Sequence, residues 1–300
     1  MSKVLIFGLS SQVGDALLPL LRDALFQVNS VSRQKKLNEK NIVWQQADFS
    51  NFKSVETNYD AIISLGPLDA FTNWFLSSNI MTKKIIALSS TSIITKKKSP
   101  DPIERELAQR LHQSEQLLLQ QAEKVAASLI ILRPTLIYGT GRDQSLSRLL
   151  HMAKRYKCVL LPKNATGLRQ PVHAADVAGA VFKALELPGF DQLILDLPGG
   201  ETLSFEQMLS RSLQRHAPKT IFLRIPDRLF ELILRSAVFL GFAIGMGPGF
   251  FARLSEDWVF DAAPAHRPRV LVQRIHRAGL CTASGSAPQC AGPAWPRLHR

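Results

Sequence analysis

The sequence predicts an α/β fold in which helices cover both faces of a parallel sheet, and three observations support this prediction. Short apolar runs with β-branched centres recur along the first two thirds of the chain. Segments of helical or loop character separate these runs, which is typical of strands joined by crossover helices. The 300 residues, 46% hydrophobic and 20% charged, have the composition of a folded protein with one large domain or two small ones.

Six strands are expected early in the chain, each a short apolar run bounded by polar or turn-forming residues. They cover residues 3–9, 27–32, 42–48, 60–65, 84–90 and 128–133. Pro134 stops the last of these runs because proline lacks the amide that a central strand needs. Two further strands are expected at 192–197 and 221–225.

Helices are expected where apolar residues recur at helical spacing. The first helix, 11–21, has its apolar stripe on Val13, Leu17, Leu18 and Leu21. The clearest helix, 104–125, has its stripe on Leu107, Leu111, Leu118, Ala122 and Val125. Residues 174–187 predict another helix, whose start Asp176 is expected to cap, and a long apolar helix is expected after Pro226.

The first strand runs into a turn of sequence Gly8-Leu-Ser-Ser11-Gln12-Val13-Gly14, which opens the first helix. Such a turn lets backbone amides at a helix N-terminus approach a pyrophosphate, and Ser11 stands where a third small residue is expected. Any strand–turn–helix connection of an α/β protein looks similar, so both interpretations stay open. A Rossmann-type, doubly wound sheet with a smaller C-terminal, substrate-side lobe is the fold that fits.

The end of the second strand bears on the choice of cofactor. It reads Ser30-Val-Ser32-Arg33 and offers no acid for a ribose 2′-hydroxyl. Arg33 suits a 2′-phosphate, which favours NADP over NAD, unless it is simply an exposed arginine after a strand. Asp48, at the end of the third strand, either hydrogen-bonds an adenine or caps a turn.

Four segments in order resemble the extended short-chain dehydrogenase/reductase family of NAD(P)-dependent nucleotide-sugar epimerases and dehydratases. They are the Gly8–Gly14 turn, the serine-rich 88–92, the LRPTLIYG segment 131–139, and the RQPVHAADVA segment 169–178. Together they span residues 1–187, and residues 253–261 resemble the family's C-terminal pattern. The resemblance implies cofactor contacts from Gly8, Ser11, Gln12, Val13, Gly14, Arg33, Asp48, Ser90 and Pro134.

The family's hydride transfer uses a tyrosine base with a lysine four residues on. A tyrosine hydroxyl has a pKa of about 10, so it needs a nearby ammonium to act as a base at neutral pH. No tyrosine of this chain has a lysine four residues later. Aligned on Glu115, which resembles the family's acidic residue on that helix, the two positions fall on Leu107 and Leu111. The pair is absent.

The remaining candidates are polar residues with two interpretations each. Thr91 or Ser92 would hold a substrate oxygen, or simply form a turn at a strand end. Tyr138 would contact a ligand or serve structure. Arg169 resembles the arginine that meets a nucleotide diphosphate, or it is a solvated side chain. His173, the third substrate candidate, is otherwise an orienting core residue.

Two functions follow from the resemblance. The first is an NAD(P)-binding epimerase, dehydratase or reductase that acts on a nucleotide sugar or a similar carbonyl or alcohol. The alternative is a non-catalytic NAD(P)H-binding regulator or assembly subunit, which the missing tyrosine and lysine favour. We expect an NAD(P)-binding domain over 1–168, to which 169–197 return, and the lobe over 198–264. We expect no metal site. We also expect no nucleic-acid binding, because no helix interleaves arginines with aromatic residues.

The net charge of +13 is unevenly distributed. Residues 265–300 hold six arginines and no acid, and we hypothesise that this atypical tail is translated in a shifted frame and is not part of the fold. Without it the net charge is +7, which weakens the case for a polyanion partner. The uncharged run 236–252 predicts a buried or groove-lining helix, or else peripheral membrane contact. Three scattered cysteines and no signal peptide predict a cytoplasmic location.

Overall fold

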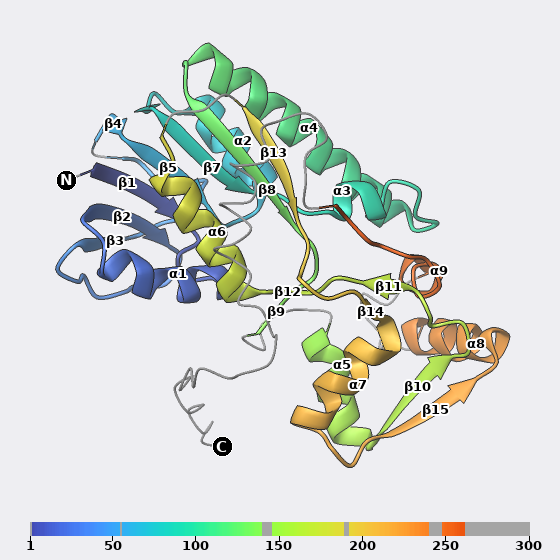
Figure 1. Ribbon diagram of the computed structural model, residues 1–300. Helices are drawn as coiled ribbons and strands as arrows, with labels where there is room; N and C mark the ends of the chain where they lie inside the picture. The colour runs from blue at the N-terminus through green and yellow to red at the C-terminus, as the bar shows by residue number, and fades with distance from the viewer. Residues whose placement is uncertain (1, 55, 140–145, 189–191, 240–247, 262–300) are drawn as a thin grey trace.

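The computed structural model describes residues 2–54, 56–139, 146–188, 192–239 and 248–261 (Figure 1). The basic tail therefore lies outside the described residues, as does the middle of the run 236–252. A central sheet, layered between helices, occupies one end of the molecule, and a smaller lobe of helices and short strands lies at the other.

The central sheet has seven strands, all paired in parallel, in the order β13-β8-β7-β5-β1-β2-β3. Their bounds are β1 Ser2–Phe7, β2 Phe26–Ser32, β3 Ile42–Gln46, β5 Ala61–Ser64, β7 Lys84–Leu88, β8 Ser128–Pro134 and β13 Leu193–Leu197. The predicted α/β fold is confirmed. Because β2 lies on one side of β1 and β5 on the other, the order of strands reverses between β1 and β5, where doubly wound sheets bind their ligands.

Helices cover both faces of the sheet because its strands point apolar side chains alternately to one face and to the other. Val4 and Ile6 of β1 pack on α1 (Gln12–Arg22) and α6 (Ala174–Glu186), within the first of three buried clusters. Leu5 and Phe7 point the other way, into a second cluster with α2 (Leu68–Ser77) and α4 (Pro102–Lys124). This alternation with period two places the last four residues of the strand, 4–7, in a core on one face or the other.

A third buried cluster forms the core of the lobe. Its elements are α5 (Leu146–Tyr156), β10 (Cys158–Pro162), α7 (Phe205–His216), β15 (Ile221–Ile225), α8 (Asp227–Phe239) and α9 (Pro248–Ala252). β10 pairs in parallel with β15. Because Ala153, Val159 and Leu161 belong to this cluster, the lobe draws on two separate stretches of chain and not on 198–264 alone.

Short elements connect the sheet to the lobe. The pairs are β9 (Ile137–Tyr138) with β12 (Val172–His173), and β11 (Leu168–Arg169) with β14 (Leu203–Ser204). At the N-terminal edge of the sheet β4 (Asn58–Tyr59) pairs with β6 (Met81–Thr82), and α3 (Ser92–Thr95) follows β7. His173 caps the N-terminus of α6, because its Nδ1 accepts a hydrogen bond from the Ala175 amide at 3.2 Å. The expected cap, Asp176, lies instead in the first turn.

Candidate functional site

The turn after β1 needs glycine at both ends. Gly8 has a φ of +81°, which side-chain-bearing residues rarely adopt. At Gly14 an added Cβ would lie 2.2 Å from the Leu9 carbonyl oxygen, because α1 begins against the turn. Ser11 caps α1, since its Oγ accepts from the Gly14 amide at 3.2 Å. The turn thus has no room for a side chain at Gly8 or Gly14, as expected of the glycines in a dinucleotide-binding turn at the switch point of a sheet.

Two other predicted cofactor residues lie at the ends of β2 and β3. Arg33 is exposed directly after β2. The Asp48 carboxylate accepts from the Ser50 hydroxyl at 2.6 Å and the Ser50 amide at 2.8 Å, and these bonds lower its pKa. Asp48 therefore caps a turn in this structure. Val13 is buried in the first cluster, so it shapes the turn from beneath.

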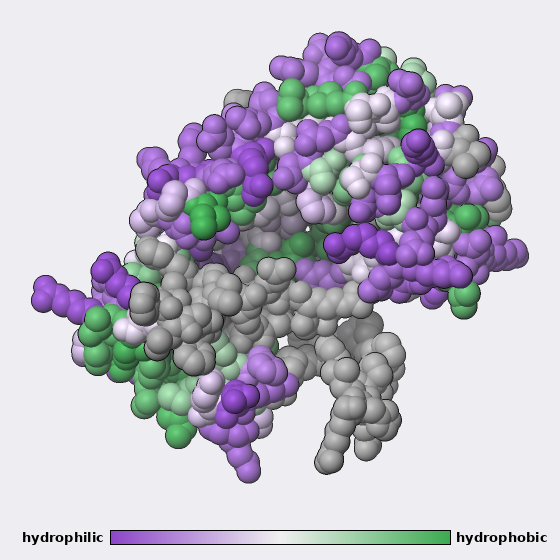
Figure 2. Space-filling view, turned by 180° about the vertical axis from the view of Figure 1, so that it is seen from behind, coloured by the Kyte–Doolittle hydropathy of each residue, from purple (hydrophilic) through white to green (hydrophobic). Residues whose placement is uncertain are grey.

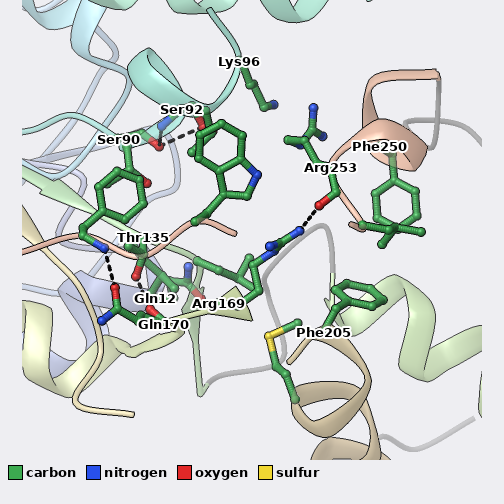
Figure 3. Close-up of a pocket in the computed structure, with 18 residues that line it drawn as sticks. Gln12, Ser90, Ser92, Lys96, Thr135, Arg169, Gln170, Phe205, Phe250 and Arg253 are labelled. Carbon is green, nitrogen blue, oxygen red and sulfur yellow. Dashed lines mark hydrogen bonds between the residues drawn. The ribbon is translucent and has the colours of Figure 1, made fainter. Parts of the chain in front are cut away.

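A cavity of about 470 Å³ lies between the end of the sheet and the lobe (Figure 3). Five parts of the chain line it: the first turn, the end of β7 with α3, the segment after β8, β11 with the residue that follows it, and the lobe. Its polar lining includes Gln12, Ser90, Thr91, Ser92, Lys96, Thr135, Arg169, Gln170 and Arg253. The structure thus brings together the predicted residues Gln12, Ser90, Thr91, Ser92 and Arg169.

The serine-rich end of β7 presents hydroxyls to this cavity. Ser90 Oγ donates to Ser92 Oγ at 3.0 Å and accepts from the Ser92 amide at 3.1 Å. Thr91 is buried, and its amide and hydroxyl both donate to the Pro134 carbonyl, at 3.2 and 3.4 Å. Ser90 and Ser92 are therefore better placed than Thr91 to hydrogen-bond a ligand.

Cations line the opposite side. Arg169 donates to the carbonyls of Leu168 at 2.7 Å and Glu256 at 2.6 Å, and to that of Arg253. Burial lowers the pKa of Arg169 to about 10, and the positive charge of Arg253 acts in the same direction. Excess positive charge in a half-closed space favours an anionic ligand.

Arg253 is held by helix α4. It donates to both carboxylate oxygens of Glu104, with Nη2 to Oε1 at 2.7 Å. The Ser99 hydroxyl donates to the same carboxylate at 2.7 Å, and Lys96 lies 3.5 Å from it. Burial raises the pKa of Glu104, but the bonds from Arg253 and Ser99 outweigh it, and the net pKa is lowered. The carboxylate is therefore ionised and fixes Arg253 beside the cavity.

The segment 248–260, which we call the C-terminal strap, closes the cavity. Its Trp258 amide donates to the Leu168 carbonyl at 2.9 Å, and its Phe260 amide to Gln170 Oε1 at 2.7 Å. Asp257 accepts from the Leu168 amide at 2.8 Å. The indole nitrogen of Trp258 is buried and has no hydrogen-bond partner among the described residues. A buried N–H next to a cavity is a donor that a ligand would satisfy.

Leu107 and Leu111 are half-buried on α4, and neither lines the cavity. Leu111 packs against the second cluster. Four residues on, Glu115 is fully buried, accepting from Ser89 Oγ at 2.6 Å and from Arg133 Nε at 2.9 Å. The described residues lining the cavity include no carboxylate, histidine or tyrosine. The usual proton acceptor is therefore missing from the position where the resemblance places it.

Tyr138 and His173 lie outside the cavity lining and contact each other, with ring centroids 5.2 Å apart. Burial raises the pKa of Tyr138, and Asp176 adds to the effect, so its hydroxyl stays protonated. Gly139 has a φ of +124°, and an added Cβ there would lie 2.3 Å from His173 Nε2. These residues shape the segment beside the cavity, and Pro134, at the end of β8, serves as the acceptor for Thr91.

Sequence reasoning did not select Phe205, Phe250 or Trp258 as lining residues. The strap residues had one signal, the family-like pattern of residues 253–261. Nothing in the sequence marked Glu104 as the partner of Arg253, because the two are 149 positions apart.

Residues 77–192 match the model of the NAD dependent epimerase/dehydratase family. This match confirms the resemblance of the sequence motifs. No curated protein matches the chain.

Many solved structures share the fold. One is MoeE5 in complex with UDP-glucuronic acid and NAD, with a TM-score of 0.60 and 17% identity over 75% of this chain and 86% of that one. The UDP-glucuronic acid 4-epimerase from Bacillus cereus in complex with NAD aligns with a TM-score of 0.59 and 16% identity, over 74% and 87% of the two chains. TunA, an NAD dependent NDP-hexosamine 5,6-dehydratase, aligns with a TM-score of 0.60 and 15% identity, over 75% and 84%. At these identities the likeness shows the fold.

Proposed function

We propose that this chain, whose central part matches the NAD dependent epimerase/dehydratase family, binds NAD or NADP at the first turn and a nucleotide-linked sugar in the adjoining cavity. The proposal rests on one observation, that the first turn adjoins the cavity. A turn with no room for side chains at Gly8 and Gly14 meets a cavity whose charged lining residues are cations. The solved neighbours bound to NAD and UDP-sugars support the same assignment.

In this proposal each part of the site has a binding role. The turn amides and the N-terminus of α1 hold the cofactor diphosphate. Ser90 and Ser92 hydrogen-bond a sugar hydroxyl or carbonyl, while Lys96 and Arg169 attract the phosphates of the nucleotide. When bound, the nicotinamide supplies hydride acceptance and return. A proton released from a sugar hydroxyl passes to water, because the lining residues among those described include no carboxylate, histidine or tyrosine.

We infer a preference for NADP from the end of β2. Arg33 is exposed there, and residues 30–33 contain no acid to bind a ribose 2′-hydroxyl. NADPH is expected to raise the melting temperature more than NADH does. The variant Arg33→Ala should reduce the NADPH shift and leave the NADH shift unchanged. Equal shifts in the wild type, or none, would contradict the preference.

A second function is favoured by one observation, the apolar residues at 107 and 111. In this version the chain binds cofactor and nucleotide sugar without turnover and acts as a regulator or a subunit of an assembly. Loss of a general base typically costs ~10²–10⁴-fold in rate. Incubation with NADP or with NAD, each with a panel of UDP-sugars, followed by chromatography, separates the two. Sustained formation of an epimer or dehydration product supports the enzyme, and binding without product supports the non-catalytic protein.

The division into domains follows the same logic. We propose that, among the described residues, those of 2–139 and 170–197 form the cofactor half, and those of 146–169 and 198–261 form the substrate half with the strap. The buried clusters support this division, since the first two belong to the sheet and the third to the lobe.

A further inference from the structure

Helix α8 is apolar on two opposite faces. Its inner face, with Phe230 and Leu234, packs in the lobe's cluster, and the Phe230 ring stacks on Phe251 at 5.8 Å between centroids. Its outer face exposes Leu229 and, three and four residues further on, Leu232 and Ile233. Leu232 is 62% exposed, although a surface helix normally carries polar residues at such positions.

The exposed apolar surface extends onto the neighbouring strand. β15 precedes α8 directly and exposes Ile221, at 62%, and Leu223. Figure 2 shows apolar side chains gathered over this part of the lobe, at the lower left of the view. We call Ile221, Leu223, Leu229, Leu232 and Ile233 the outer apolar face. A contiguous apolar surface of this kind marks an interaction site more often than single exposed residues do.

Outside residues 265–300, the lobe holds most of the excess positive charge. Residues 146–169, 198–239 and 248–261 contain 13 Lys and Arg against 7 Asp and Glu, whereas 1–139 and 170–197 contain 17 against 16. Three of these arginines and two of these acids lie within the same two elements as the outer apolar face, namely Arg224, Arg228, Arg235, Asp227 and Glu231. Arg224 and Arg235 pair with Glu206 and Glu231, but these pairs are exposed and weak, so their cations remain available to a stronger anionic partner.

We propose that the outer apolar face docks on an anionic lipid surface, with α8 lying in the plane of the interface. An amphipathic helix with leucines toward the acyl chains and arginines at the headgroups binds in this way. Among the described residues, no helix is both long and apolar enough to span a membrane. The proposal does not depend on the function of the cavity.

A second copy of the chain fits this surface less well. A symmetric contact would bring the same basic lobe against itself, because a two-fold interface uses one patch twice. Two lobes with like net charge repel, whereas anionic headgroups neutralise the arginines. The charge therefore selects lipid over self-association.

Sedimentation of the full chain with vesicles tests the proposal. The chain should bind vesicles rich in phosphatidylglycerol, bind phosphatidylcholine vesicles weakly, and lose affinity as salt is raised. The single variant Leu232→Gln should weaken binding about ten-fold, and Leu229→Gln/Leu232→Gln/Ile233→Gln more, because each leucine loses its insertion into the acyl layer. Arg228→Glu should weaken binding to phosphatidylglycerol about five-fold or more.

The matched control is Ile103→Gln/Leu117→Gln, which replaces exposed apolar residues of α4, 74% exposed in the case of Ile103. It should bind as the wild type does. The arginines of residues 265–300 are present in every variant, so binding through them is a constant background. Circular dichroism and the melting temperature check that each variant folds.

Three results would overturn the proposal. The first is a wild type that does not bind phosphatidylglycerol vesicles. The second is a Leu232→Gln variant that binds them as tightly as the wild type. The third is light scattering that finds a dimer which the triple variant dissociates, since the face would then join two copies.

Discussion

Gly8 and Gly14 occupy the same short turn but are required for different reasons. Gly8 adopts a positive φ, whereas Gly14 lies where the backbone of Leu9 approaches too closely for any side chain. The sequence pointed to both positions because a glycine at a strand–helix junction indicates either a positive φ or a close approach of the backbone. It could not predict the role of Thr91, because the Pro134 carbonyl that its amide and hydroxyl bond is brought near only by the fold. For Asp48, the structure shows the second of the two interpretations that the sequence left open, a turn cap formed with its neighbour Ser50.

The close approach at Gly14 predicts a loss of stability. The variant Gly14→Ala places a Cβ against a backbone carbonyl that cannot rotate away, so α1 must shift. We expect the free energy of unfolding to fall by about 1–3 kcal/mol, measured by urea denaturation. The control is Gly66→Ala, where the nearest atom is the edge of the Phe49 ring at 3.3 Å. Equal effects of the two variants would contradict the steric argument.

The unpartnered indole of Trp258 predicts opposite effects on stability and binding. Phenylalanine keeps the apolar contacts and removes a buried N–H that has no partner among the described residues. Trp258→Phe should therefore leave the melting temperature of the free protein unchanged or raise it. Calorimetry with a UDP-sugar should show binding weakened about ten-fold, since the N–H then bonds the ligand. Unchanged affinity would place the indole outside the binding interaction.

At the scale of elements, prediction succeeded where a segment has one buried environment. The central strands are buried on both faces, so their apolar runs were found within a few residues of their true ends. Helices α2, α5 and α7 were not assigned, although α5 and α7 carry apolar residues at helical spacing. The signal for α7 was present, since Ser204 and Gln207 form a capping box.

The strap is attached to α4 by the pair of Glu104 and Arg253, and this attachment depends on pH. The pKa of Glu104 is lowered in the folded protein, so the pair adds stability above the carboxyl's unfolded pKa. The contribution is lost as pH falls through the lowered pKa. At neutral pH the variant Glu104→Gln should be less stable than the wild type by about 1–3 kcal/mol.

Urea denaturation across the acid range measures the difference between wild type and Glu104→Gln. The difference in free energy of unfolding should be constant near neutral pH and should disappear as the wild-type carboxyl is protonated. Glu106→Gln, which makes the same change of acid to amide at an exposed position two residues further along the helix, is the control and should show no such pH dependence. A difference that persists at low pH would mean that the stability comes from packing and not from charge.

The whole molecule joins a doubly wound parallel sheet to a basic lobe. The fold class followed from alternating strands and helices, and the motifs indicated the family whose model residues 77–192 match. The cavity did not follow, because it draws Gln12, Ser90, Arg169 and Arg253 from four distant parts of the chain. The absence of the tyrosine and lysine could be predicted, because the sequence alone shows leucine at 107 and 111.

The central claim is that the first turn and the cavity beside it bind a dinucleotide, and titration calorimetry of the full chain with NADPH and NADH tests it most directly. The account predicts saturable binding of one molecule per chain, tighter for NADPH. Arg33→Ala should abolish the difference between the two cofactors without abolishing binding. A folded wild type that shows no binding of either cofactor would contradict the account.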